Sequence, residues 1–252
     1  MISGQLAAIG MYPFVEARAG FDALWVGVHA RLPSTPAALD WDTDLHASWR
    51  DPNLLVAQTC GWPLVTELAG AVRVVGAFEH TVPRAVGFRY RSVLVARRQA
   101  PLADFVGQRA AVNGRDSLSG WVSLIHAVHG SDSSWTGPVV LTGAHIASLR
   151  AVRDGDADIA SIDSVTLAFA RRDHPELLDG VVEVGEGPLV PSLPLITRAD
   201  ASDDEVNDLR LAFAGSVAEQ PDAAASVFVR AFVPLDVAVY EPLLALGAHL
   251  PS

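Results

Sequence analysis

The sequence contains a single cysteine, Cys60, in a chain of 252 residues. A lone cysteine excludes an intramolecular disulfide and a zinc site built from several cysteines. The chain also lacks any run near the ~18 consecutive apolar residues that a transmembrane helix requires. Hydrophobic residues nevertheless make up 50% of the composition, which is enough for one or two buried cores.

Basic residues are scarce. The chain has 18 Lys and Arg residues against 29 Asp and Glu residues, which gives a formal net charge of −11. Arg97-Arg98 and Arg171-Arg172 are isolated pairs rather than parts of a basic block. Because a nucleic-acid-binding protein needs a basic patch, we do not expect that function. A small anion still binds an acidic protein where helix N-termini supply local donors.

Signatures of common enzyme and cofactor sites are also missing. The segment 117–120 (SLSG) lacks the first glycine of the G-x-S-x-G nucleophile elbow. The segment 185–187 (GEG) is followed by Pro188 rather than by a helix, so it is no dinucleotide fingerprint, and there is no Walker A sequence. His126 and His129 share an expected helix but lack a third ligand at a suitable spacing. We therefore expect no cofactor and no metal.

Strand and helix patterns alternate along nearly the whole chain, which is typical of α/β proteins. Five of the expected strands end in polar residues, and three of these endings open a helix, where free backbone N–H groups favour an anion. Because ligands of open α/β sheets bind at the carboxyl ends of strands, we predict a concave polar site there. The residues are Tyr12; Gln58, Thr59 and Cys60; Asn113, Asp116, Ser117, Ser119 and Gly120; Thr142 and His145; and Asp163 and Ser164.

The segment 142–164 shows this pattern most clearly. The preceding apolar residues predict a buried strand, and Thr142 is expected to cap the helix that follows. Gly155 is expected to end that helix in the left-handed conformation. A second strand is predicted over 157–162, with Asp163 capping the next helix. The whole segment is predicted to form a βαβ unit.

Two stretches containing proline and glycine, 83–87 and 181–194, are predicted to be crossovers between two lobes. The first lobe is predicted to comprise residues 1–84 and 195–252, and the second residues 85–194. Other expected elements are a short strand over 37–41, a fourth strand over 72–77, a long strand over 88–96, a helix capped by Ser202 or Asp203, and a closing helix over 237–246.

The residues resemble the phosphate/phosphonate-binding proteins of ABC transporters, which have the type II periplasmic binding protein fold. The resemblance is strongest in Thr142 to Ser148 (TGAHIAS) and in 157–164 (ADIASIDS). It extends to a loose match with the N-x-x-x-S-x-S-G anion loop in 113–120 and to a crossover strand in 90–93. The resemblance covers nearly the whole chain.

The resemblance implies an α/β protein of two lobes, joined by two crossover strands, with a cleft between the lobes. It implies non-catalytic binding of a small oxyanion-bearing solute, with a possible ABC permease as partner. Ser117, Ser119 and helix-start N–H groups would hold the oxyanion, His145 would add a donor, and Asp163 would accept hydrogen bonds or fix the pocket. The implied ligand-binding set is Tyr12, Gln58, Thr59, Asn113, Ser117, Ser119, Gly120, Thr142, His145, Asp163 and Ser164.

Two departures from the family pattern bear on function. The chain does not open with a charged region and a long apolar region, as a secretion signal does. The resemblance thus implies a periplasmic protein, whereas the first residues suggest a cytoplasmic relative or a mature form without its leader. Asp116 in the anion loop would repel a phosphonate dianion unless it caps from outside or pairs with a ligand amine. The alternative prediction is an enzyme of the same fold that uses Cys60 or His145 on a small metabolite.

Overall fold

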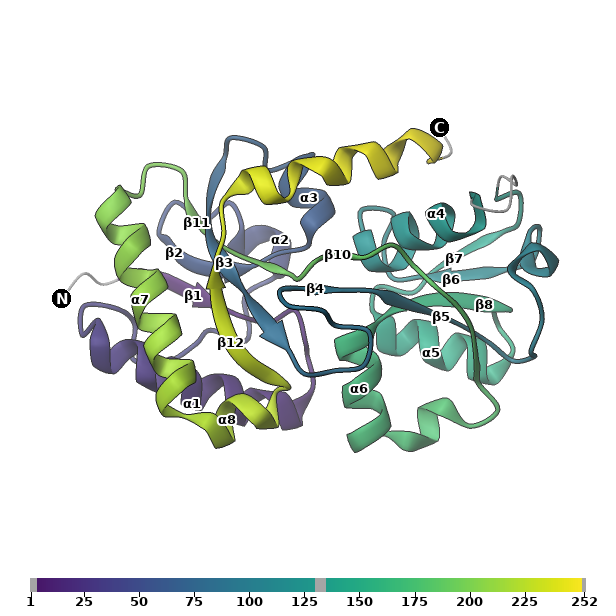
Figure 1. Cartoon of the computed structure of the whole chain (residues 1–252), viewed down its shortest axis with the longest axis horizontal. Helices are drawn as coiled ribbons and strands as arrows, with labels where there is room; N and C mark the ends of the chain where they lie inside the picture. Colours follow the sequence, from purple (N-terminus) through teal and green to yellow (C-terminus); the bar gives the residue numbers. More distant parts are fainter. Residues whose placement is uncertain (1–3, 130–134, 251–252) are drawn as a thin grey trace. The chain divides into compact units, whose positions relative to one another are not determined.

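A computed structural model describes residues 4–129 and 135–250 and divides the chain into two compact units (Figure 1). The first unit comprises the residues up to Thr81, residues 86–88 and residues 191–241. The second comprises residues 82–85, residues 89–190 and the residues from Pro242 onward. The short strands β4 (Arg89–Tyr90) and β10 (Val190–Pro191) pair with each other in a two-stranded sheet. None of the helices within the described ranges is both long and apolar enough to cross a membrane.

The first unit is built on a five-stranded sheet with the order β1-β2-β11-β3-β12. β1 and β2 are parallel, and β11 runs antiparallel to both β2 and β3. The carboxyl ends of β1, β2 and β3 therefore lie at the same edge of the sheet. The strands are β1 (Leu6–Ala8), β2 (Leu54–Gln58), β3 (Val72–His80), β11 (Pro194–Arg198) and β12 (Val229–Pro234).

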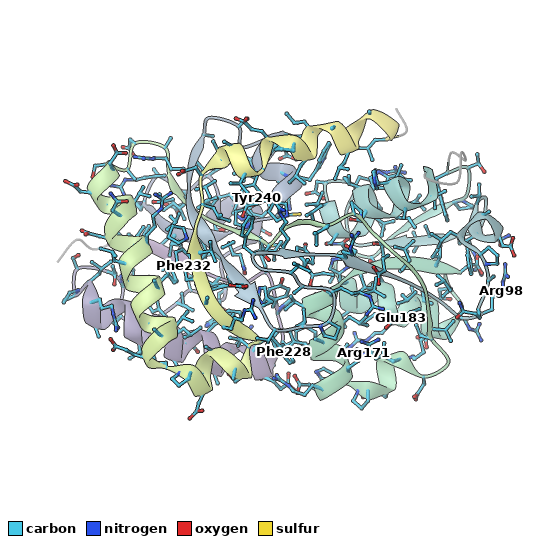
Figure 2. All side chains as sticks on the ribbon, in the orientation of Figure 1. Arg98, Arg171, Glu183, Phe228, Phe232 and Tyr240 are labelled. Carbon is cyan, nitrogen blue, oxygen red and sulfur yellow. The ribbon has the colours of Figure 1, made fainter. Side chains whose placement is uncertain are left out.

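Three helices cover one face of this sheet, namely α1 (Val15–Arg31), α7 (Asp203–Glu219) and α8 (Pro221–Ser226) (Figure 1). Aromatic side chains from helices and strands fill the core beneath them. Phe78 of β3 lies 6.1 Å from Phe21 of α1 and 6.0 Å from Phe213 of α7, measured between ring centroids. Phe232 of β12 stacks on Phe213 at 5.3 Å (Figure 2). Such rings contribute large apolar areas to the core.

Helix α7 begins where the sequence predicts, because its start is encoded locally. Ser202 is the N-cap, and its hydroxyl accepts a hydrogen bond from the Glu205 N–H while the Glu205 carboxylate accepts one from the Ser202 N–H. This reciprocal pairing satisfies amides that a helix otherwise leaves open. The Ser202 amide and Arg198 lower the pKa of Glu205 to about 2. The first unit also contains the short helices α2 (Leu45–Ser48) and α3 (Gly61–Val65).

The second unit is built on another five-stranded sheet, with the order β7-β6-β8-β5-β9. β6 is parallel to both β7 and β8, and β5 is antiparallel to β8 and β9. A hydrophobic core lies on each face, one containing Leu149 and Leu167 and the other containing Trp121 and Leu124. The strands are β5 (Ser92–Ala96), β6 (Ala110–Val112), β7 (Val139–Leu141), β8 (Ile159–Asp163) and β9 (Val182–Glu186).

The helices of the second unit alternate with these strands, so the predicted α/β class is confirmed. Ion pairs tie its outer elements together, and one of them joins Arg171 to Glu183 of β9 (Figure 2). The helical segments are η1 (Leu102–Phe105), η2 (Leu118–Val122), α4 (Ser123–His129), α5 (His145–Asp154), α6 (Ser164–Asp173) and η3 (Pro175–Leu178).

Several predicted elements are wrong or displaced. The expected strand over 37–41 is irregular, because the Asp40 carboxylate accepts hydrogen bonds from the Asp42 and Thr43 amides and turns the chain. The strand expected over 88–96 is split into β4 and β5, and the fourth strand is longer than predicted. β9, α8 and β12 were not predicted. In place of one closing helix are two 3₁₀ segments, η4 (Val237–Val239) and η5 (Glu241–His249).

Candidate ligand-binding site

The carboxyl ends of β6, β7 and β8 meet at one edge of the second unit's sheet, because these strands are parallel neighbours. A helical segment follows each of them: η2 after β6, α5 after β7 and α6 after β8. Helix N-termini carry open amides and the positive end of the helix dipole. The predicted residues between Asn113 and Ser164 therefore belong to one edge of one sheet.

The loop before η2 has a tight, specific geometry. Ser117 is the N-cap, and its hydroxyl accepts a hydrogen bond of 3.0 Å from the Gly120 N–H. The Val122 N–H donates to the Ser117 carbonyl at 3.0 Å, which makes this first turn a wide π-turn. A Cβ atom on Gly120 would stand only 1.8 Å from Asn113 Oδ1. That oxygen is buried and has no hydrogen-bond partner in the described part of the chain.

His145, the first residue of α5, connects that helix to η2. Its Nε2 atom lies 2.7 Å from the hydroxyl oxygen of Ser119. The Ser161 hydroxyl of β8 donates to the Ser119 carbonyl at 2.6 Å, so three elements converge on Ser119. Burial lowers the pKa of His145 to about 4, against a smaller opposing effect of the Ser161 backbone. His145 is therefore neutral at pH 7.

Thr142 and Asp163 have structural roles in this arrangement. The Thr142 hydroxyl lies 2.7 Å from Ser148 Oγ and 3.2 Å from the Val112 carbonyl oxygen. The predicted capping role of Thr142 is wrong, because Ala144 is the N-cap of α5. Asp163 does cap α6, since its carboxylate accepts hydrogen bonds from the next two amides at 2.7 and 2.9 Å. These amides of α6 are consequently occupied.

Ser164 and Asp116 complete the set in the second unit. The Ser164 hydroxyl is buried and has no partner within residues 4–129 and 135–250. Asp116 lies against the backbone of Gly114, where an added Cβ would approach its carboxylate to 2.4 Å. The guanidinium of Arg115 packs 5.0 Å from the Trp121 ring centroid. The loop thus carries one exposed cation beside one carboxylate.

The remaining predicted residues lie in the first unit, at the carboxyl ends of β1 and β2. Tyr12 is buried and follows β1, and Gln58 and Thr59 end β2. Trp49 Nε1 donates to the Gln58 carbonyl at 2.9 Å and the Thr59 N–H donates to the Pro194 carbonyl at 3.0 Å. Both side-chain atoms of Gln58 and the Thr59 hydroxyl are buried without a hydrogen-bond partner in the described chain.

His80 is a residue of this edge that the sequence interpretation missed. It ends β3, and its ring lies 6.0 Å from the Tyr12 ring in an edge-to-face arrangement. Its Nδ1 atom lies 3.2 Å from the Phe228 carbonyl oxygen, while its buried Nε2 has no partner among the described residues. Burial lowers the pKa of His80 to about 4. A strand prediction that ran to the next polar residue would have found it.

The alternative enzyme hypothesis finds no catalytic grouping. Cys60 is the N-cap residue of α3 in the first unit, whereas His145 belongs to the second unit and faces Ser119. The described ranges contain no group of three or more His, Cys, Asp or Glu residues that is arranged to hold a metal ion. The arrangement supplies hydroxyl, imidazole and backbone hydrogen-bond donors instead.

A family model described as the periplasmic substrate-binding protein of phosphonate ABC transporters matches residues 56–240. The chain belongs to this family. Its members are binding proteins of ABC transporters rather than enzymes, so the predictions of a family, of non-catalytic binding and of no enzymatic activity are confirmed. The family also implies a small ligand and a transporter permease as partners. A comparison with curated proteins gives no match.

Solved structures give the same fold. A binding protein component of an ABC phosphonate transporter from Pseudomonas aeruginosa is 17% identical, with a TM-score of 0.78 over 96% of this chain and 86% of that one. PhnD1 from Prochlorococcus marinus, in complex with methylphosphonate, is 11% identical, with a TM-score of 0.77 over 96% of both chains. A Xanthomonas citri protein bound to ATP is 14% identical, with a TM-score of 0.71 over 98% of both chains. The predicted two-lobed periplasmic-binding-protein fold is thereby confirmed.

Proposed function

We propose that the second unit binds the oxyanion of a phosphonate- or phosphate-like solute at the starts of η2 and α5. The observation that carries the proposal is the convergence of both helix starts on the contact between Ser119 and His145. Hydroxyl and imidazole groups become strong donors when the acceptor is an anion, because such hydrogen bonds are charge-assisted. The chemistry of these side chains fits the family's ligand class.

The oxyanion is assigned to η2 and α5 rather than to α6. Asp163 already accepts the first amides of α6 and brings a negative charge to that helix start. A second anion at the same amides would meet repulsion and find no open donor. Asn113, Ser117 and Gly120 shape the loop, and Ser119 and His145 supply donors. Thr142 supports α5 from behind without touching the ligand.

The role of the first unit follows from the family. We propose that Tyr12, Gln58 and Thr59 contact the part of the solute that is not the oxyanion, and that the loaded protein delivers the solute to an ABC permease. Support comes from the match over residues 56–240 and from the buried polar atoms of Gln58 and Thr59. No bond of the ligand is made or broken in this function.

Calorimetric titration with methylphosphonate and inorganic phosphate tests the oxyanion assignment. Replacing the imidazole in His145→Ala should weaken binding by about 1.5–3 kcal/mol, the range for a hydrogen bond to a charged group. The matched control is His174→Ala, because His174 follows α6 in the same unit and pairs with Glu176 at 3.6 Å. Unchanged affinity in His145→Ala would remove this residue from the site, and equal losses in both variants would point to a general effect on folding.

A further inference from the structure

Gln58 is the polar residue at the end of an otherwise apolar buried strand, LLVAQ. Its side chain is fully buried, and neither its Oε1 nor its Nε2 has a hydrogen-bond partner in the described part of the chain. A buried amide without a partner costs about 1–3 kcal/mol for each unsatisfied group. An apolar side chain of the same length would avoid this cost. The amide therefore has a use that the isolated chain does not show.

The strand pairing places His80 on the same face of the sheet as Gln58. Leu195 of β11 lies opposite both Gln58 of β2 and Gly76 of β3, and directly opposed residues share a face. His80 shares the face of Gly76, because alternate residues of a strand point the same way. The unpartnered Nε2 of His80 thus belongs to the same carboxyl-edge face, where Tyr12 packs against the His80 ring.

The buried polar side chains of the first unit are uncharged. Among the described residues they are Thr35, Ser48, Gln58, Thr59, His80, Ser192, Thr197 and Ser216. Asp163, the buried carboxylate of the described chain, belongs to the second unit and caps α6. An ammonium group brought against these side chains would be a buried charge without a counter-ion, which is strongly unfavourable. A purely aliphatic group would leave the Gln58 amide unpaired.

We propose that Gln58, with His80 on the same sheet face, recognises an uncharged group that both donates and accepts hydrogen bonds, such as a hydroxyl or a carboxamide. This inference rests on the proposed function, because the group is carried by the same solute whose oxyanion binds in the second unit. The solute class is accordingly a small phosphonate or phosphate with a neutral polar substituent. A primary amine or a simple alkyl chain is disfavoured.

The test compares three probes of similar size by calorimetry: 2-hydroxyethylphosphonate, ethylphosphonate and 2-aminoethylphosphonate. The wild-type protein should bind the hydroxyl compound at least about tenfold more tightly than either of the others, which is the effect of one well-made hydrogen bond. In Gln58→Met, which keeps the length and removes the amide, the preference over ethylphosphonate should fall below about threefold. In Gln58→Glu the amine should become the preferred probe, because a carboxylate now faces it.

The thermal stability of the ligand-free Gln58→Met variant supplies a second readout. Removal of an unpartnered buried amide should leave Tm unchanged or raise it by about 2–4 °C. A clear fall in Tm would show that the amide already has a partner within the protein and would overturn the inference. Equal wild-type affinities for the hydroxyl and alkyl probes would also overturn it, with Gln58 then satisfied by buried water, while the oxyanion assignment stands. Absence of binding by all three probes and by phosphate would overturn the proposed function itself and this inference with it.

Discussion

The substitution Gly120→Ala tests how tightly the anion loop is constructed. The added methyl carbon would stand 1.8 Å from Asn113 Oδ1 and 3.1 Å from Ser117 Oγ. Carbon and oxygen atoms in contact are ordinarily about 3.3–3.6 Å apart, so the Asn113 amide must move by roughly 1.5 Å. Glycine is required here by the close approach of Asn113, since Gly120 is not among the residues with positive φ.

The expected consequence falls on binding rather than on folding. A misplacement of about 1 Å in a positioned site costs on the order of 100-fold, which is about 2.7 kcal/mol. The gain in helix propensity from glycine to alanine, up to about 1 kcal/mol, offsets part of the steric cost in stability. Calorimetry with methylphosphonate should therefore show about a 100-fold loss of affinity, while urea unfolding shows a change of no more than about 2 kcal/mol.

A double-mutant cycle identifies the cause. If the methyl group acts by displacing the Asn113 amide, then adding Gly120→Ala to an Asn113→Ala protein should cost less than about threefold in further affinity, because contacting residues are not additive. The reasoning is refuted if Gly120→Ala alone stays within threefold of wild type. It is refuted equally if the substitution costs the same 100-fold in both backgrounds.

Three further predictions concern other parts of the chain. Thr142→Val should lower stability by about 1–3 kcal/mol, because it leaves the buried Ser148 hydroxyl unpaired, and should change affinity less than threefold; a tenfold affinity loss at unchanged stability would make Thr142 a ligand contact. Between pH 6.5 and pH 4 the unfolded chain takes up a proton at His80 that the folded protein, with a pKa of about 4, does not, so stability should fall by about 3 kcal/mol as the pH drops; urea unfolding of His80→Gln should show a smaller fall, and parallel curves would contradict this. Ser202→Ala removes the cap of α7 and should cost about 1 kcal/mol in the same assay, whereas no change would mean that Glu205 alone suffices.

Locally encoded features were predictable from the sequence. The left-handed Gly155 that ends α5 has a φ of 84°, and the Ser202 and Asp163 caps lie where the pattern of polar and apolar residues places them. Each depends on a few neighbouring residues, so it survives whatever the rest of the chain does. The polar endings of β6, β7 and β8 were predictable for the same reason.

Elements that depend on distant partners were not predictable. β9 lies within a stretch interrupted by glycine and proline, and its strand conformation comes from pairing with β5. β12 and the last three residues of β3 support each other through pairs such as Val229 with His80, which is why His80 escaped notice. The role of Thr142 was misread because its partners, the Val112 carbonyl and Ser148, are set by tertiary structure.

The distribution of the polar strand endings between sheets also needed the structure. The sequence placed five polar clusters at carboxyl ends of strands, and the structure assigns those of Tyr12 and Gln58 to the first sheet and the other three to the second. That division separates an oxyanion site of neutral donors in the second unit from an uncharged polar edge in the first. Periodicity along a chain carries no information on which sheet a strand joins.

The central claim is that this protein binds an oxyanion without altering it, and phosphorus-31 NMR tests that claim most directly. Methylphosphonate titrated into the protein should give a bound resonance that saturates at one equivalent, and the total intensity should stay in the substrate signals overnight. The same titration of His145→Ala should saturate at a concentration about 10–150 times higher, in line with the loss of one charge-assisted hydrogen bond. A spectrum that stays unshifted at millimolar ligand, or a new product resonance, would contradict the account.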